Sequence, residues 1–283
     1  ELGIDALKAI WHRGAVDADG KTGDGAGIHV QIPVSFFYDQ IERTGHKPRK
    51  DELMAVGQVF LPRADFGAQE TCRSIVETEV LRMGYYIYGW RHVPVKTDCL
   101  GEKANATRPE IEQILISNSK GVDQDTFERE LYVIRRRIEK SASQAGVSQL
   151  YLASLSCRSI IYKGMMLAEQ VAVFYPDLCD ERFTSTFAIY HQRYSTNTFP
   201  SWDLAQPFRA IAHNGEINTF RGNKNWMKVH EQEMDSNLFE DIENLKPVIQ
   251  PGTSDSAALD NVFELLNISG QPAPLAKLML VPD

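Results

Sequence analysis

The sequence contains few cysteines and no long apolar run. Its 283 residues include only Cys72, Cys99, Cys157 and Cys179. No C-x-x-C spacing occurs and no histidine stands at a zinc-ligand distance, so neither a metal site nor a disulfide framework is predicted. No apolar stretch approaches the roughly 20 residues that span a bilayer, and no signal-peptide pattern opens the chain. These absences predict a cytoplasmic protein in a reducing compartment, with no metal site and no membrane contact.

Clustered positive charge is also scarce. The formal net charge is −8 at pH 7, and a nucleic-acid or anionic-membrane surface would need a clustered basic patch. The nearest approach is Arg135, Arg136 and Arg137 with Lys140, within "TFERELYVIRRRIEK". This stretch has the pattern of an amphipathic helix with a charged side, so we expect a solvated helix face. Nucleic acid is therefore not an expected partner.

Hydrophobic residues make up 43% of the chain, enough for a substantial core in one or two globular units. The glycine-rich residues 12–27 lack the strand–turn–helix order of a dinucleotide-binding motif and predict a turn. Helices and strands alternate in runs, which favours an α+β fold with largely antiparallel sheets. The sequence predicts helices at 3–11, 35–45, 65–84, 124–142 and in the last third, and strands at 28–33, 53–62, 85–95, 111–117, 149–156, 159–166, 183–195 and 208–213.

The stretch "RAIAHNGEIN" carries the first candidate for chemistry. It is an apolar, strand-like run that ends at His213, Asn214 and Gly215. An Asn-Gly pair between apolar residues is a strong signal for a type I′ hairpin turn. A side-chain amide beside a glycine N–H also makes a pair of donors suited to a developing oxyanion. Both interpretations stay open at this point.

Two further segments carry candidate charges. Arg193 in "HQRYSTNT" ends an apolar run and predicts either a surface charge or a bidentate clamp for a carboxylate. In "GTSDS", Ser254 or Asp255 could cap the following helix, or Asp255 could receive an ammonium group. An arginine for a carboxylate, an aspartate for an ammonium and an Asn-Gly pair for an oxyanion describe a pocket for a free amino acid attacked at a side-chain carbonyl.

Taken in order along the chain, these motifs resemble a known family. "HRGAVDADGKTGDGAGI", "YGWRHVPV", "RRRIEK", "HQRYSTNT", "SWDLAQPF", "AHNGEIN" and "GTSDS" are similar to the glutaminase domain of the glutamate synthase large subunit. That domain is a class II glutamine amidotransferase, an N-terminal-nucleophile hydrolase with a four-layer αββα sandwich. The resemblance covers residues 1–283, so one such domain is expected.

The resemblance implies a role for each candidate residue. Arg193 would hold the α-carboxylate of glutamine and Asp255 its α-ammonium group. The Asn214 amide and the Gly215 backbone N–H would form the oxyanion hole. The other implied residues are Tyr194 and Thr196, which would line the pocket, and Arg13 with Gly14, whose turn would shape the floor beneath the nucleophile.

The start of the chain departs from the family pattern. The family's nucleophile is an N-terminal cysteine whose own α-amino group serves as the base, whereas this chain begins with Glu1. None of the four cysteines precedes the Arg13–Gly14 turn. We therefore expect a domain truncated at both ends, which lacks the strand that carries the nucleophile and is inactive as a glutaminase by itself.

For a complete parent, the resemblance implies hydrolysis of L-glutamine and transfer of the ammonia to 2-oxoglutarate in later domains. FMN and an iron–sulfur cluster are expected in those domains and no cofactor in this one. Expected partners are the remaining synthase domains and a small electron-donating subunit or ferredoxin. The alternatives are another class II amidotransferase, or a non-catalytic domain of the same fold for glutamine binding or subunit contact.

Overall fold

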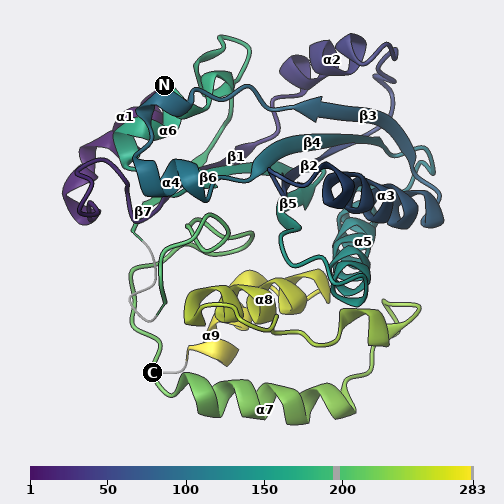
Figure 1. Ribbon diagram of the computed structural model, residues 1–283. Helices are drawn as coiled ribbons and strands as arrows, with labels where there is room; N and C mark the ends of the chain where they lie inside the picture. The colour runs from purple at the N-terminus through teal and green to yellow at the C-terminus, as the bar shows by residue number, and fades with distance from the viewer. Residues whose placement is uncertain (194–197, 282–283) are drawn as a thin grey trace.

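The computed structural model describes residues 1–193 and 198–281, which form an α+β fold (Figure 1). Within these residues seven strands form two sheets, and every strand pairing is antiparallel. This mixture of helices with two antiparallel sheets agrees with the N-terminal-nucleophile type of fold that the sequence predicts. The predicted strands other than 208–213 are present, with ends shifted by a few residues.

The smaller sheet carries the strand that leads to Arg193. Its strands, in the order β6-β1-β7, are β6 (Ser159–Gly164), β1 (Ala26–Gln31) and β7 (Ala188–Gln192). Helices α1 (Leu2–Ala9) and α6 (Ala168–Phe174) pack against this sheet. Ile4 and Leu7 of α1 and Ile28 of β1 belong to one buried cluster. The apolar positions of α1, spaced as on one helix face, therefore fix the helix to the sheet.

The larger sheet is covered by two long helices on one face. Its strands, in the order β3-β4-β2-β5, are β3 (Tyr86–His92), β4 (Glu110–Ser117), β2 (Met54–Leu61) and β5 (Tyr151–Ser156). Alternate residues of β2 point to opposite faces. Ala55 and Val59 pack with α3 (Phe66–Arg82) and α5 (Gln124–Gln144), whereas Val56 and Phe60 join the cluster that contains Ile28. One core therefore joins the two sheets, and a second lies under α3 and α5.

Shorter elements connect these layers. They are α2 (Val34–Arg43), α4 (Glu102–Ala106) and four 3₁₀ turns at Trp11–Arg13, Thr97–Cys99, Pro176–Cys179 and Ile242–Leu245. Phe36 and Phe37 of α2 add to the core that joins the sheets. In the described ranges, no helix has the length and apolar character of a membrane span.

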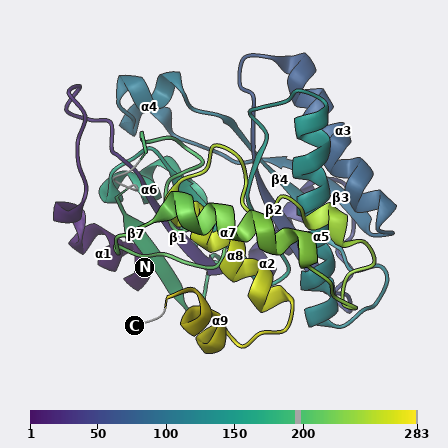
Figure 2. The same ribbon diagram turned by 90° about the horizontal axis from the view of Figure 1, so that it is seen from below.

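The last third of the chain is helical, as predicted. Helices α7 (Phe220–Glu233), α8 (Asp255–Ile268) and α9 (Ala273–Leu280) gather on one side of the molecule, below the sheets in Figure 1 and toward the viewer in Figure 2. Tyr132 of α5 packs with Phe239, Leu245 and Leu265 in a third apolar cluster. This cluster fixes α8 against α5, and α8 begins at the predicted ammonium-binding residue.

The predicted solvated face at Arg135–Arg137 is wrong. Arg135 and Arg136 are only 2% and 4% exposed. Arg135 forms ion pairs with Glu139 of its own helix and Glu264 of α8, and Arg136 donates to the carbonyl oxygens of residues 245 and 247. The C-terminal segment covers this side of α5, so the charges are buried in pairs, an arrangement that helical periodicity alone does not reveal.

Candidate functional site

Arg193 follows the last residue of β7. Its backbone N–H donates to the Gly25 carbonyl oxygen at 2.9 Å, and its φ of 130° lies in a region that non-glycine residues rarely adopt. Such strain costs roughly 1–3 kcal/mol and is concentrated at functional sites. The side chain is exposed, and no acidic residue within the described ranges forms an ion pair with it. The guanidinium is therefore accessible to an anionic ligand.

Tyr194 and Thr196 lie outside the described residues, so their predicted pocket roles remain predictions. Arg13 ends a 3₁₀ turn and is exposed. The adjacent Gly14 approaches Gln192 so closely that a Cβ at position 14 would lie 1.8 Å from the Gln192 Nε2 atom. The Arg13–Gly14 turn thus packs against the residue that precedes Arg193.

Asn214 and Gly215 do not follow a strand. The predicted strand 208–213 and the hairpin at Asn214-Gly215 are both wrong, because residues 211–218 have no regular secondary structure. Instead, side chains bind this backbone. The amides of Ala210 and Ile211 donate to Asp260 Oδ1 at 2.8 and 2.9 Å. These bonds replace the ladder that a partner strand would have supplied.

The two predicted oxyanion donors are exposed at the end of this segment. The Gly215 N–H donates to Nδ1 of His213 at 3.1 Å. The Gly215 N–H therefore has a partner within the protein, and a bound oxyanion would have to replace it.

Asp255 is the first residue of α8. The cap is Ser254, whose Oγ accepts a hydrogen bond from the Ala257 N–H at 3.1 Å. The capping interpretation is therefore confirmed for Ser254 and not for Asp255. The Asp255 carboxylate is buried, with Oδ1 accepting from the Ser256 N–H at 2.7 Å. A carboxylate in the first turn of a helix is favoured by the positive end of the helix dipole.

His213 joins the three candidate segments. Its carbonyl oxygen accepts a hydrogen bond from Nε2 of His191, two residues before Arg193, at 3.0 Å. Burial lowers the pKa of the His213 imidazole, and the negative charge of Asp255 opposes that shift. The end of β7, residues 213–215 and the start of α8 therefore lie together, although they are far apart in the sequence.

Several buried polar atoms around this junction have no hydrogen-bond partner. Among the described residues they include Nε2 of His213 and both amide atoms of Gln192, which is 1% exposed. Buried polar atoms in native proteins are nearly always paired, so unpaired ones point to a ligand or a bound water. Their position beside Arg193 and Asp255 marks this junction as the candidate site.

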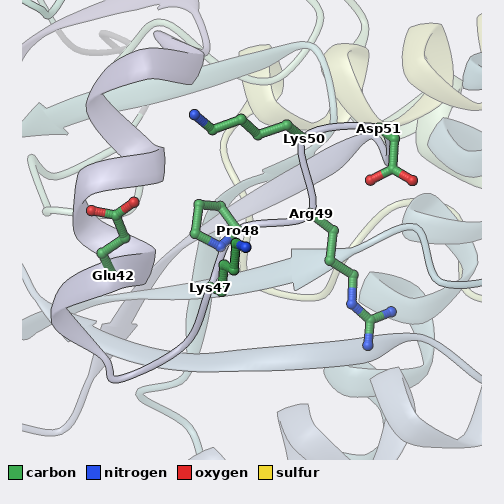
Figure 3. A pocket seen from close by; sticks show the side chains of 6 residues that line it. All are labelled: Glu42, Lys47, Pro48, Arg49, Lys50 and Asp51. Carbon is green, nitrogen blue, oxygen red and sulfur yellow. The ribbon is translucent and has the colours of Figure 1, made fainter.

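Two hollows lie elsewhere on the surface. One of about 630 Å³ is lined by Glu42 and residues 47–51 (Figure 3). Its charged side chains point in different directions, and Arg49 pairs with Glu52, so it has no convergent polar groups. A larger hollow of about 900 Å³ is lined in part by Trp202, Arg209 and Thr253. Its lining includes residues of α5 and Thr253, two residues before Asp255.

The cysteines offer no nucleophile at this junction. Burial raises the pKa of the Cys72 thiol to about 11, and it also raises the pKa values of Cys99 and Cys157. Cys179 belongs to a 3₁₀ turn that follows α6. Among the described residues, no three histidine, cysteine or acidic side chains form a group that could hold a metal ion.

Comparison with known proteins identifies the family. A family model described as "Glutamine amidotransferases class-II" matches residues 1–283. The chain belongs to the class II glutamine amidotransferases. Membership agrees with the motifs of the sequence and with the two antiparallel sheets.

The related amidotransferases are glutamate synthases. The chain is 64% identical over 284 residues to the glutamate synthase [NADPH] large chain of Azospirillum brasilense, covering 100% of this chain and 19% of the relative. It is 43% identical over 282 residues to the chloroplastic ferredoxin-dependent glutamate synthase of Spinacia oleracea, covering 99% and 17%. For the glutamate synthase [NADPH] large chain of Bacillus subtilis the identity is 42% over 287 residues, covering 99% and 18%. The chain thus spans less than a fifth of these relatives.

Sequence reasoning missed the residues that hold the 209–215 segment, above all Asp260 and Gln206. Asp260 stands within the apolar run "AALDNVFELL", and an acidic residue on the buried side of a helix was the available signal. Gln206 gave no comparable signal, because its partners are the backbone atoms of His213.

Proposed function

We propose that this amidotransferase chain is the glutaminase part of a glutamate synthase, the part in which the complete natural polypeptide hydrolyses L-glutamine to glutamate and ammonia. The observation that carries the proposal is the junction at His213, which hydrogen-bonds to His191 beside Arg193 and lies within the electrostatic influence of Asp255. A clamp for an amino acid needs a cation, a carboxylate and carbonyl-directed donors at one place.

Arg193 and Asp255 recognise the α-carbon end of glutamine in this proposal. The guanidinium of Arg193 is planar and binds a carboxylate through two parallel hydrogen bonds. Asp255 is buried, and a buried carboxylate interacts strongly with an ammonium group because little water screens the pair. Tyr194, Thr196 and Arg13 are assigned supporting positions in the pocket, as the family resemblance implies.

Asn214 and Gly215 stabilise the tetrahedral intermediate. The side-chain amide of Asn214 and the backbone N–H of Gly215 would donate to the oxygen that becomes negative when the carboxamide is attacked. The Gly215 N–H is bonded to the His213 imidazole in this structure. Glutamine binding would therefore exchange that bond for one to the substrate.

The attacking group is not assigned to any of the four cysteines, since none belongs to the candidate site. In the family mechanism the α-amino group of the N-terminal cysteine takes the proton of its own thiol, and the thiolate attacks the carboxamide carbon of glutamine. Ammonia leaves with that proton, and water then hydrolyses the thioester to glutamate. We assign to residues 1–283 the binding of glutamine and the stabilisation of the oxyanion.

The ammonia would pass to 2-oxoglutarate in the remaining synthase domains of the natural protein. FMN and an iron–sulfur cluster belong to those domains in this proposal. The described residues contain no cysteine or histidine group able to hold such a cluster, so no ligand to it is assigned here. The names of the relatives specify NADPH for two of them and ferredoxin for the third. A small electron-donating subunit or ferredoxin is the corresponding proposed partner.

Ammonia release from L-glutamine tests the proposal in the complete natural polypeptide. Arg193→Ala and Asp255→Asn should each lower kcat/KM by about a hundredfold, because truncating one partner of a buried charge pair costs several kcal/mol. Arg158→Ala, which alters a half-exposed arginine in the turn between β5 and β6, should leave kcat/KM unchanged.

The same assay separates the alternatives. Glutamine binding without ammonia release would favour the non-catalytic domain. Ammonia release without 2-oxoglutarate-dependent glutamate formation would favour another class II amidotransferase. Wild-type activity in both site variants would contradict the assigned site.

A further inference from the structure

The backbone before the oxyanion donors is bound by one carboxylate. Oδ1 of Asp260 accepts hydrogen bonds from the N–H groups of Ala210 and Ile211 at 2.8 and 2.9 Å, and Oδ2 accepts a longer one from Arg209 at 3.4 Å. Asp260 is 0% exposed and belongs to α8, about 50 residues further along the chain. A carboxylate that accepts backbone N–H bonds forms charge-assisted bonds, which are stronger than neutral ones.

The other hydrogen bonds of this segment also come mainly from side chains. Gln206 accepts from the His213 N–H at 3.1 Å and donates to its carbonyl oxygen at 3.3 Å. Within the segment, the Phe208 N–H donates to the Ile211 carbonyl at 3.0 Å. Among the described residues, no strand pairs with it. Its path from Arg209 to His213 is therefore set largely by Asp260 and Gln206.

Helix α8 carries residues that act at both ends of the proposed substrate, the α-ammonium group and the side-chain carboxamide. Asp255 starts the helix and Asp260 stands five residues later, about 7.5 Å along the axis at the rise of an α-helix. A rigid helix carries one carboxylate for the ammonium group and a second for the segment that leads to Asn214 and Gly215.

We propose that Asp260 is a positioning residue for amide hydrolysis. By binding the backbone at Arg209–Ile211, it holds the oxyanion donors at a fixed distance from the carboxylate of Asp255. The inference rests on the proposed function and adds a residue that touches neither substrate nor reacting atoms. Displacement of a catalytic group by about 1 Å costs about a hundredfold in rate. Loss of the hydrogen bonds from Asp260 should therefore lower kcat.

Burial and the neighbouring charges set the pKa of Asp260. Burial and the nearby negative charge of Glu264 raise the pKa of Asp260 to about 6, while Arg209 and the N–H groups of Ala210 and Ile211 oppose that rise. At neutral pH and above, Asp260 is therefore mostly ionised and both oxygens accept hydrogen bonds.

The test uses the complete natural polypeptide at a pH well above 6. Asp260→Asn keeps the size of the side chain but turns one acceptor oxygen into an NH₂ donor. We expect kcat for ammonia release from L-glutamine to fall by about tenfold to a hundredfold, with KM changed by less than about threefold, the pattern of an interaction needed in the transition state. Asp260→Glu, which retains the carboxylate, should restore part of the rate.

Glu264→Gln is the matched control. Glu264 is an acidic residue one turn later on α8 that pairs with Arg135, and in the described part of the chain it forms no hydrogen bond to residues 209–215. Its kcat should match the wild type within about threefold. Hydrogen exchange supplies an independent readout, because Asp260→Asn should speed exchange in peptides covering 208–213 and leave the peptides of α5 unchanged.

Each outcome is decisive. If the wild type hydrolyses glutamine and Asp260→Asn has the same kcat, the inference alone is overturned. The same holds if only KM rises, or if exchange increases throughout α5 and the sheets, which would indicate a general structural role. If the wild type releases no ammonia from glutamine, the proposed function fails and the inference fails with it.

Discussion

Nε2 of His191 lies 3.0 Å from the carbonyl oxygen of His213. This hydrogen bond joins the C-terminal end of β7 to the segment that carries Asn214 and Gly215. The backbone of His213 also bonds to Gln206, so the imidazole of His191 completes a small buried network. The bond therefore links Arg193 to the predicted oxyanion donors.

Replacement of His191 by alanine removes this link. We expect the free energy of unfolding to fall by about 2 kcal/mol, since a buried carbonyl loses a donor and a buried ring is deleted. Denaturation by urea measures the change. His230→Ala, at an exposed position of α7, should change stability by less than about 0.5 kcal/mol. Equal stability of the two variants would contradict the role of the bond.

Gly14→Ala tests the close approach of the Arg13–Gly14 turn to β7. The new Cβ would lie 1.8 Å from Nε2 and 2.6 Å from Cδ of Gln192, and the buried amide has little room to retreat. Overpacking of this kind costs about 1–3 kcal/mol. In Gly67→Ala the new Cβ would contact only Asp65 Oδ1, at 3.4 Å, and a helix position gains from alanine. In thermal unfolding, Gly14→Ala should lower Tm and Gly67→Ala should raise it. An unchanged Tm in Gly14→Ala would contradict the close packing of Gly14 against Gln192.

Arg135→Ala tests the buried network that joins α5 to α8. Its removal leaves Glu264 without its buried partner and Glu139 with Arg136 alone as a close one. Breaking a buried pair in this way costs about 3–5 kcal/mol. Lys140→Ala, on the same helix but exposed, should cost less than about 0.5 kcal/mol. Urea denaturation of both variants checks the difference. A loss as small as that of Lys140→Ala would mean that Arg135 is not held in the buried pairs.

The burial of Lys163 should make the free energy of unfolding depend on pH. This residue is 0% exposed, its Nζ donates to the Tyr151 hydroxyl at 2.9 Å and the Asp203 carbonyl at 2.7 Å, and burial followed by the charge of Arg209 lowers its pKa to about 7. An unfolded lysine has a pKa of about 10.4. Between these values the unfolded chain binds more protons, so stability rises with pH.

Lys163→Met should remove that slope. Between about pH 7 and pH 9.5, the stability of the wild type relative to the variant should increase by up to about 3 kcal/mol. Below pH 7 the difference should be constant, because lysine is then protonated in both states. Urea denaturation at several pH values measures both curves. Parallel curves across this range would contradict a strongly lowered pKa.

Much of the fold could be predicted because its elements are locally encoded. The short apolar run of β2 and the long amphipathic pattern of α5 gave ranges within a few residues of Met54–Leu61 and Gln124–Gln144. Tertiary burial could not be predicted in the same way. The arginines at 135 and 136 look solvated until the segment around Leu245 covers them.

The sequence motifs named Arg193, Asn214, Gly215 and Asp255 as candidates but did not give their arrangement. The structure brings their segments together at His213, and their roles stay predictions. The strand predicted at 208–213 was wrong because its backbone N–H groups bind side chains from elsewhere in the chain and not a partner strand. Apolar alternation does not distinguish these two cases. Asp260 supplies those bonds from about 50 residues away. The helical pattern signals that its carboxylate is buried, but not which backbone groups it binds. The cytoplasmic location stays a prediction.

A crystal structure of the complete natural polypeptide with L-glutamine bound would test the central claim most directly. The account predicts the α-carboxylate within hydrogen-bonding distance of the Arg193 guanidinium and the α-ammonium beside Asp255. It also predicts that the side-chain carbonyl oxygen faces the Asn214 amide and the Gly215 N–H, with the bond from Gly215 to His213 broken. Glutamine bound elsewhere, such as in the hollow beside Trp202 and Thr253, with Arg193 and Asp255 uninvolved, would contradict it.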